Sequence, residues 1–216
     1  MTPRRYQQRA RAEDAARTRT RIIEAVFDSL RDSPADPVAI GQIARDAGVA
    51  RSTVYAIFGS RAGLFDAVGR ELADRSGYSS LVDAKHQPDA RDYLRAGMRA
   101  YGRMVAANRD IYRALRSMGQ LDEEAVGGVV KRMDEERAAA MKRLAGRLAE
   151  QGALRDRLST RDAEHILFML TGFESFDTLL TERGLSRDKA VDLLINTAEQ
   201  ALYAKPTAMG RRGRRR

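Results

Sequence analysis

The sequence predicts an all-α protein. Three observations favour this fold class. Apolar residues recur at helical spacing along most of the 216 residues, no segment alternates apolar and polar residues as a strand does, and Gly, Ser and Asp stand where helices would end and begin. The apolar share of 43% is large enough for a core. We expect a small N-terminal head and a larger helical bundle, joined by the polar segment Gly77–Pro88.

The segment Ile40–Phe65 has the spacing of a helix-turn-helix. Ala44 stands four residues before Gly48, where two closely crossing helices need a small side chain. Gly48 suits the turn because it has no Cβ and can take positive φ. Val49 supplies an apolar plug beneath the turn, and Val54 points inward from the second helix. The motif is predicted at about 39–58; the alternative is an ordinary helical hairpin in a core.

The second helix of this motif has a polar outward side. Arg51, Ser52, Thr53 and Tyr55 lie on or near that side. Arginine can bind guanine with two hydrogen bonds, hydroxyl groups can bond phosphate oxygens, and a helix N-terminus directs free N–H groups at an anion. The segment therefore predicts sequence-specific DNA binding in the major groove.

The N-terminal part of the sequence resembles the tetracycline-repressor (TetR) family. The resemblance covers about residues 16–76, including TRIIEAVFDSL at Thr20–Leu30 and IARDAGVARSTVYAIFGSRAGLFDAV after it. Such a long shared pattern is much more specific than a lone short motif. The residues that match the family pattern are Arg19, Ile22, Ala25, Ile43, Ala44, Ala47, Gly48, Val49, Thr53, Val54, Tyr55, Phe58 and Arg61.

The resemblance implies roles for the polar residues of the head. Arg51 and Ser52 would approach base edges, Thr53 and Tyr55 would contact phosphate, and Arg61 would anchor the DNA backbone. We also expect Gln42 to contact DNA. The alternatives are that Tyr55 is an aromatic at the edge of the core and that Arg61 is a solvated charge at a helix start.

The head departs from the family pattern at several polar positions. Ala39, Gly41 and Ile57 stand where the family usually has polar or aromatic side chains, and Ala50 replaces the usual Ser cap. These helices should therefore supply fewer polar contacts than is usual, and part of the DNA affinity must come from elsewhere.

The net charge of +9 is concentrated at the two ends of the sequence. A basic arm is predicted at residues 1–15, ahead of the helix-turn-helix domain at 16–76, and it could follow phosphates or enter the minor groove. A second basic segment, 205–216, could add non-specific attraction, or it could be a disordered, solubilising tail.

Beyond residue 76 the sequence predicts one helix after another, which together form a domain at 77–204. Asp122, Ser159 and Ser186 are placed to cap helix starts, and Gly152 and Gly184 are placed to end helices. The expected helices are Ala90–Asn108, Arg109–Met118, Asp122–Gln151, Thr160–Arg183 and Arg187–Ala204.

The last two predicted helices are apolar over more than one face. A helix of that kind buries two faces, so we expect a four-helix interface with a second copy of the chain; a deeply buried monomer core is the alternative. The resemblance implies the same homodimer, whose two heads would bind a palindrome. The expected interface residues are Ile166, Leu170, Leu179, Val191, Leu194, Ile195, Ala198 and Leu202.

Methionine and aromatic residues at helical spacing suggest a pliant apolar pocket in the same domain. The resemblance implies a small-molecule effector there, and we expect a lipophilic or aromatic one. Core packing is the alternative for each residue. The candidate effector-binding residues are Met98, Tyr101, Tyr112, Met118, Met141, Met169, Phe173, Phe176 and Asp177.

Other classes of function find little support. There is no cysteine, and His86 and His165 are too isolated for a metal cluster, so we expect no metal and no cofactor. No nucleophile–base pair or phosphate-binding Gly loop indicates an enzyme. No apolar run approaches the roughly eighteen residues of a membrane span, and no secretion signal is present, so a cytoplasmic protein is expected.

The sequence thus predicts a bacterial transcriptional regulator. We expect a dimeric repressor that binds a palindromic operator and is released by a small-molecule effector. Its partners would be double-stranded DNA, a second copy of the chain and the effector, with no membrane. The alternative is a basic protein that coats DNA irrespective of sequence through its Arg-rich ends.

Overall fold

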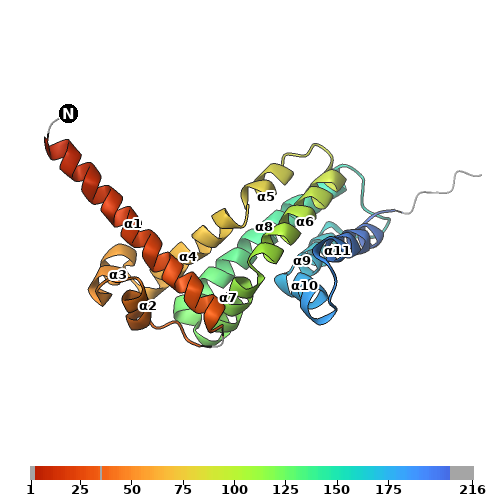
Figure 1. The fold of residues 1–216 in the computed structure, drawn as a ribbon. Coiled ribbons are helices and arrows are strands. Elements are labelled where there is room, and N and C mark those ends of the chain that lie inside the picture. Colours follow the sequence, from red (N-terminus) through yellow and green to blue (C-terminus); the bar gives the residue numbers. More distant parts are fainter. Residues whose placement is uncertain (1–2, 35, 205–216) are drawn as a thin grey trace, which may run out of the picture. The chain divides into compact units, whose positions relative to one another are not determined.

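The computed structural model of the protein describes residues 3–34 and 36–204. Within these ranges the chain forms α-helices and two short π-helices, with no β-strand, which confirms the all-α prediction (Figure 1). The basic segment predicted at 205–216 lies outside the described residues. Among the residues that are described, no helix combines the length and apolar composition needed to cross a lipid bilayer.

The helices follow one another with short connections. In chain order they are α1 (Pro3–Asp32), α2 (Ile40–Asp46), α3 (Arg51–Phe58), α4 (Arg61–Arg75), α5 (Ser79–Ala84), α6 (Ala90–Ala107), α7 (Arg109–Leu121), the π-helix η1 (Glu123–Gly127), α8 (Gly128–Glu150), α9 (Thr160–Leu170), α10 (Phe173–Asp177), the π-helix η2 (Thr178–Glu182) and α11 (Arg187–Leu202).

The chain divides into two compact units. The first comprises the residues up to Gly77 together with Met104–Glu135, and the second comprises Tyr78–Arg103 and the residues from Glu136 onward. The first unit therefore holds α7, η1 and the first turns of α8 in addition to the predicted head.

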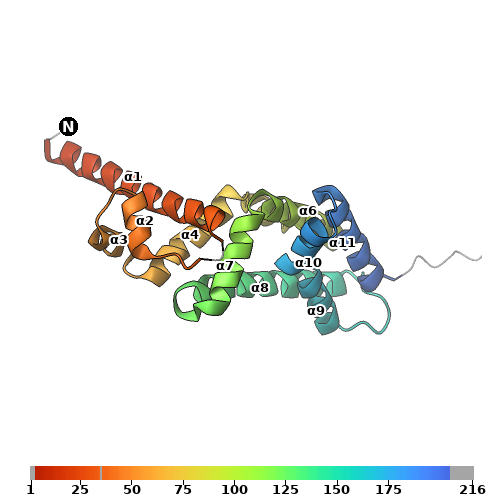
Figure 2. The same ribbon diagram turned by 60° about the horizontal axis from the view of Figure 1, so that its bottom comes forward.

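Helix α1 begins well before the helix expected near Thr20. Pro3 occupies the first helical position, where its missing N–H costs nothing, and the Arg-, Ala- and Gln-rich segment after it favours helix. The predicted basic arm is thus helical from Pro3 onward. Its side chains from Arg11 to Arg17 are exposed, whereas Ile22, further along, is fully buried. In Figure 2 the N-terminal half of α1 extends beyond α3.

The C-terminal half of α1 packs on α2, α4 and α7 in the first unit. An ion pair between Glu24 of α1 and Arg75 of α4 reinforces this packing at its edge. The hydrogen bond from Arg75 lowers the pKa of the Glu24 carboxyl, so this pair stays charged over the ordinary pH range. The fully buried side chains of the C-terminal half of α1 are Ile22, Ile23, Val26, Phe27 and Leu30.

The second unit has its core between α6, the later turns of α8, α9, α10 and α11. Tyr101 of α6 and Phe176 of α10 meet edge to face, with ring centroids 5.2 Å apart. A Cβ added to Gly102 would lie 2.3 Å from Cγ2 of Val191, so only glycine allows α6 and α11 to approach this closely. Helix starts in this unit follow the sequence signals: Ser159 Oγ accepts from Asp162 N at 3.0 Å, and Ser186 Oγ accepts from Lys189 N at 3.4 Å.

The single helix predicted at Thr160–Arg183 is interrupted. Helix α9 ends at Leu170, where the Thr171 hydroxyl donates to the Leu167 carbonyl at 2.7 Å. Gly172 then adopts extended backbone before α10 begins, and the Ser175 hydroxyl donates to the Met169 carbonyl at 2.7 Å. Side-chain hydroxyls that satisfy the last carbonyls of α9 permit this break, which periodicity could not reveal because the apolar pattern continues through it.

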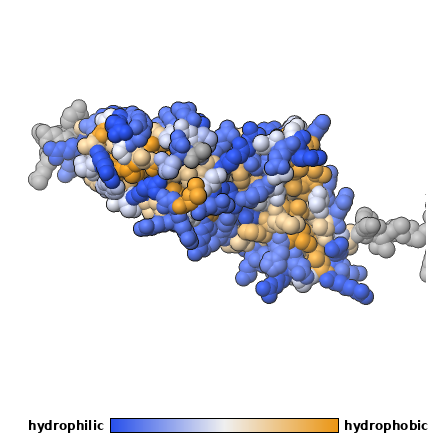
Figure 3. Space-filling model, turned by 90° about the horizontal axis from the view of Figure 1, so that it is seen from below, coloured by the Kyte–Doolittle hydropathy of each residue, from blue (hydrophilic) through white to orange (hydrophobic). Residues whose placement is uncertain are grey.

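Most residues predicted for the dimer interface are buried within the chain itself. Leu170, Val191, Leu194, Ile195, Ala198 and Leu202 are all at most 9% exposed, so they form the chain's own core, and only Ile166 and Leu179 are half-buried. Little of these six side chains is left for a partner to contact in this conformation. Figure 3 nevertheless shows apolar surface over the part of the second unit that contains α9–α11. Its exposed large apolar side chains are Met169 and Leu193, at 63% and 47%.

Candidate nucleic-acid interface

The turn between α2 and α3 has the hydrogen bonds of a glycine-centred helix end. Gly48 has a φ of 64°, Val49 N donates to the Ala44 carbonyl at 2.9 Å, and Gly48 N donates to the Arg45 carbonyl at 3.0 Å. This pair of bonds is the Schellman arrangement, which requires a residue that tolerates positive φ. The turn predicted at Gly48 is thus present.

The inward faces of the two helices match the predicted motif. Ala44 is 3% exposed and Val54 is 1% exposed, while Val49 is half-buried beneath the turn. The small Ala44 side chain lets α2 and α3 approach each other. With its inner face buried, α3 presents its other face to solvent.

The outer face of α3 carries a preorganised arginine. Arg51 Nη2 donates to the Tyr55 hydroxyl at 3.3 Å, and the Arg51 guanidinium carbon lies 5.6 Å from the centre of the Tyr55 ring. Tyr55 is 38% exposed, so it is not a core aromatic. Ser52 is exposed and Thr53 is half-buried on the same helix. An exposed guanidinium held over a tyrosine can reach a base edge or a phosphate with little loss of side-chain entropy.

The N-terminus of α3 lacks a side-chain cap. Ala50 at the N-cap has extended backbone and no side-chain hydrogen bond, as expected from its missing hydroxyl. Helix α2 likewise lacks a side-chain cap, because its N-cap residue is Ala39. The first N–H groups of α3 are therefore available to an external acceptor such as a phosphate oxygen.

Gln42 on α2 is exposed, but its side-chain amide is hydrogen-bonded to two other residues of the same helix. Its Nε2 donates to Asp46 at 2.6 Å, and its Oε1 accepts from Arg45 Nη2 at 2.6 Å. A DNA contact by Gln42 would have to keep or replace these bonds. The chain of three residues instead positions Arg45 along α2.

Arg61 differs most from the role that the resemblance implied. It forms an ion pair with Asp122, and its Nη2 donates to the Val38 carbonyl at 3.2 Å. The two charged side chains are only 28% and 30% exposed. In this conformation the Arg61 charge is neutralised inside the chain, and a phosphate could gain its attraction only by competing with Asp122.

A second polar contact joins the opposite end of α4 to the start of α7. Asn108 Nδ2 donates to the Ser76 Oγ at 2.9 Å, and Ser76 also hydrogen-bonds Tyr112. Burial raises the pKa of the Tyr112 hydroxyl, which the bond to Ser76 partly offsets. The two residues that cap α7, Asn108 and Asp122, therefore hold the two ends of α4. Sequence reasoning placed Asp122 as a helix cap, which it is, since it accepts from Ala125 N at 3.1 Å, but it missed the pairing with Arg61.

A groove of about 460 Å³ lies beside α3 in the first unit. We call it the α3–α7 groove. It is lined by the loop before α2, the outer face of α3, the start of α4 and the end of α7. Its lining residues are Pro37, Val38, Ala39, Ile40, Arg51, Tyr55, Arg61, Met118, Leu121 and Asp122.

The candidate effector residues are divided between the two units. Tyr112 and Met118 belong to the first unit, and the others belong to the second. Met98, Phe173 and Phe176 are buried, Tyr101, Met141 and Asp177 are half-buried, and Met169 is exposed. Of these, Met118 lines the α3–α7 groove, and Tyr101 and Phe176 contact each other.

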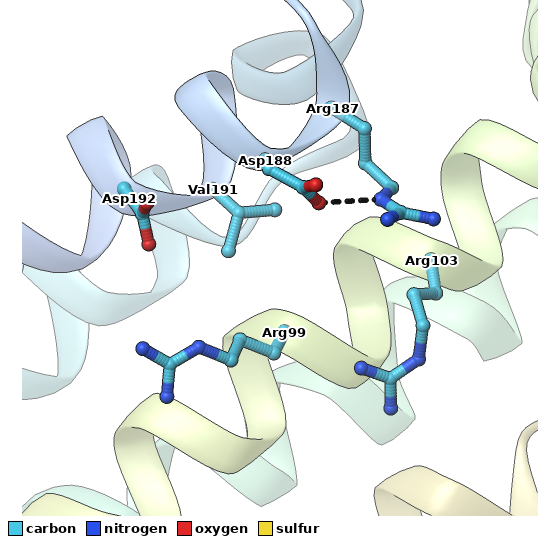
Figure 4. Close-up of a pocket in the computed structure, with 6 residues that line it drawn as sticks. All are labelled: Arg99, Arg103, Arg187, Asp188, Val191 and Asp192. Atoms are coloured by element: carbon cyan, nitrogen blue, oxygen red, sulfur yellow. Dashed lines mark hydrogen bonds and ion pairs between the residues drawn. The ribbon is translucent and has the colours of Figure 1, made fainter.

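The second unit has a smaller cavity of about 300 Å³ between α6 and the start of α11 (Figure 4). Arg99 and Arg103 of α6 line one side, while Arg187, Asp188, Val191 and Asp192 line the other. Arg187 is paired with Asp188 at 2.8 Å. This largely charged lining does not match the apolar pocket expected from the methionine and aromatic residues.

The glycine turn, the buried inner face and the exposed Arg51–Tyr55 pair define a helix-turn-helix DNA-binding protein. Residues 22–68 match the family model for bacterial regulatory proteins of the tetR family. The matched residues lie within the segment 16–76, on whose motif residues the resemblance to this family was predicted.

Comparisons with solved structures extend this likeness to the whole fold. A TetR family transcription regulator of Marinobacter aquaeolei is 18% identical, with 91% of this chain and all of that chain covered, at a TM-score of 0.63. The fatty acid degradation regulator of Bacillus halodurans is 15% identical, with 83% and 97% covered, at 0.65. The ketosteroid transcriptional regulator of Mycobacterium tuberculosis is 12% identical, with 87% and 95% covered, at 0.63. A comparison with curated protein sequences finds no match.

Proposed function

We propose that this protein is a dimeric transcriptional repressor that binds a palindromic operator and leaves it when a small lipophilic effector binds. The observation that carries the DNA-binding part is the exposed Arg51–Tyr55 pair on the outer face of α3. Arg51 and Ser52 would contact base edges, while Thr53, Tyr55 and the uncapped N-terminus of α3 would contact phosphates. Two copies related by a two-fold axis would place two such helices in major grooves about one helical turn apart.

Dimerisation in this proposal rests on the exposed apolar side chains of the second unit. Met169 and Leu193 would be covered by the partner, with the half-buried Ile166 and Leu179 beside them. A Leu193→Glu, Met169→Glu double variant should shift the protein toward monomer in sedimentation velocity. The same substitution at Leu121, which is exposed in the first unit, is the matched control and should leave the dimer intact.

Two proteins with similar folds support a lipophilic effector. One is named as a fatty acid degradation regulator and the other as a ketosteroid transcriptional regulator, and fatty acids and ketosteroids are both largely apolar compounds. The route from effector to DNA would run through α7, because its caps Asn108 and Asp122 hold both ends of α4. A displacement of α7 would move α4 and the adjoining α3, and by reciprocity DNA would weaken effector binding by the same factor.

The test is a DNA-binding titration on the region flanking the protein's own coding sequence, with scrambled DNA at several salt concentrations alongside. We expect a palindromic site to be preferred and the Arg51→Ala, Tyr55→Ala double variant to lose about a hundredfold in affinity for it. Arg103→Ala, which removes an exposed arginine from α6, is the matched control and should bind normally.

The rival function is sequence-indifferent coating of DNA through the Arg-rich ends. It predicts equal binding to scrambled DNA, steep salt dependence and no effect of the double variant on α3. That outcome would refute the proposed repressor.

A further inference from the structure

We propose that the α3–α7 groove binds a small amphipathic molecule with an apolar body and one anionic group, and that this ligand excludes DNA by direct competition. The competition clause rests on the proposed function, because it assumes that α3 contacts DNA. The site is distinct from an effector pocket in the second unit, since every residue that lines it belongs to the first unit.

The dimensions of the groove suit a small molecule. Its volume of about 460 Å³ falls within the usual range of roughly 300–1,000 Å³ for small-ligand sites. The walls come from four separate segments: residues 37–40 before and at the start of α2, the outer face of α3, the start of α4 and the end of α7. A ligand held by all four would be specific to this folded arrangement.

The walls of the groove are mainly apolar. Pro37, Val38 and Ile40 contribute aliphatic surface from the loop before α2 and the start of that helix, and Met118 contributes a flexible thioether. Leu121 at the end of α7 is 84% exposed, far more than any other large apolar side chain of the described residues. A ligand with an apolar body would cover this leucine, which the chain itself leaves in water.

The charges of the groove select an anion. Arg61 and Asp122 neutralise each other. Arg51 hydrogen-bonds only the uncharged Tyr55 hydroxyl and stacks on its ring, and no carboxylate among the described residues pairs with it. The groove therefore keeps one uncompensated positive charge, at the edge where α3 begins. A carboxylate or sulfonate on the ligand would take the position opposite Arg51.

A ligand in the groove would cover residues that the proposed DNA contact requires. Arg51 and Tyr55 line the groove and also form the exposed pair on α3. A ligand bound to the Arg51 guanidinium would block its approach to a base edge or phosphate without any change of conformation. The structure thus offers a direct inhibitory site in addition to the effector action proposed above.

The first arm of the test measures binding of anilinonaphthalene sulfonate, an aromatic sulfonate that fluoresces in apolar sites, to the full chain without DNA. Leu121→Gln should weaken dye binding by about tenfold, because the dye loses an apolar wall. Tyr78→Gln, which replaces an exposed side chain outside both the groove and the proposed dimer interface, should leave dye affinity unchanged. Equal affinity in the two variants would overturn the proposed site.

The second arm titrates the dye in the presence of increasing concentrations of a bound DNA duplex. Direct competition predicts that the apparent dissociation constant of the dye rises linearly with DNA and reaches no plateau, whereas a plateau would mean coupling at a distance and would overturn the competition. If the wild-type chain binds no DNA at all, the proposed function fails, while the first arm still decides whether the groove binds the dye.

Discussion

Arg61, the first residue of α4, forms an ion pair with Asp122, the residue that follows α7. Each partner also makes a further hydrogen bond: Arg61 donates to the Val38 carbonyl, and Asp122 caps η1 by accepting from Ala125 N. The pair therefore ties the helix-turn-helix to the turn that follows α7. The motif assigns this arginine to DNA contact, but in this conformation its contacts are within the chain and stabilise the fold.

A double-mutant cycle tests this pair. In Arg61→Ala, Asp122→Ala and the double variant, the coupling free energy of unfolding should be about 1 kcal/mol, as for a partly buried charge-assisted hydrogen bond. Urea denaturation followed by circular dichroism gives the three values. The exposed Arg187–Asp188 pair provides the comparison and should show weaker coupling. Strictly additive effects at Arg61 and Asp122 would contradict the assigned contact.

Removal of the Asp122 charge alone should strengthen DNA binding, even though it removes an ion pair that stabilises the fold. Asp122→Asn keeps the size of the side chain but frees the Arg61 charge for a phosphate. We expect the affinity for DNA to rise severalfold and the salt dependence to steepen. Unchanged affinity at low salt would mean that Arg61 does not face the DNA backbone even when it is released.

Two glycines, one within α2 and one in the turn after it, should respond in opposite ways to substitution by alanine. Gly48→Ala places a Cβ at a φ of 64° and should destabilise the protein by about 1–2 kcal/mol. Gly41 lies inside α2, where an added Cβ meets only the end of Arg45 at 3.8 Å, so Gly41→Ala should stabilise by about 0.5–1 kcal/mol. Thermal and urea unfolding measure both. Similar effects of the two substitutions would argue against the turn geometry.

The uncapped start of α3 offers a stabilising substitution. Ala50→Ser would let a hydroxyl accept from an N–H of the first turn, and the free energy of unfolding should rise by about 0.5–1 kcal/mol. Ala56→Ser, on the exposed side of the same helix, is the matched control and should be slightly destabilising because serine has lower helix propensity. The comparison fails if both variants shift the urea midpoint in the same direction.

Stability should fall at alkaline pH, partly through Tyr203. Burial, and then the nearby Glu199 charge, raise the pKa of the Tyr203 hydroxyl from 10.0 to about 12. The stabilising contribution is complete below pH 10 and declines toward pH 12, because the unfolded chain loses the proton first. Tyr203→Phe should therefore flatten the loss of stability over this interval. An unchanged pH profile would show that the hydroxyl does not titrate in this way.

The parts of the fold that the sequence predicted well depend on local chemistry. The Schellman turn at Gly48 follows from glycine stereochemistry, and the caps at Asp122, Ser159 and Ser186 follow from the acceptors on their side chains. Such features need only a few neighbouring residues, so a sequence is sufficient to specify them.

The parts that the sequence missed depend on contacts between distant residues. Arg61 and Asp122 are 61 positions apart in the sequence, and nothing near either residue indicates that they pair. The apolar positions of α11 could serve an internal core or a partner, and periodicity is the same in both cases; the fold buries Leu194 and Ile195 internally. The cavity between α6 and α11 likewise depends on how the helices cross.

The two contacts at the ends of α4 also limit how this part of the chain can change in evolution. Helix α4 has 15 residues and α7 has 13, so at 1.5 Å per residue the two are about 22 and 20 Å long. Arg61 meets Asp122 at one end and Ser76 meets Asn108 at the other only because these lengths agree. A one-residue insertion or deletion within either helix would turn the residues beyond it by roughly 100° and would break at least one of the two contacts. Viable length variation should therefore fall in the loops that flank this pair of helices.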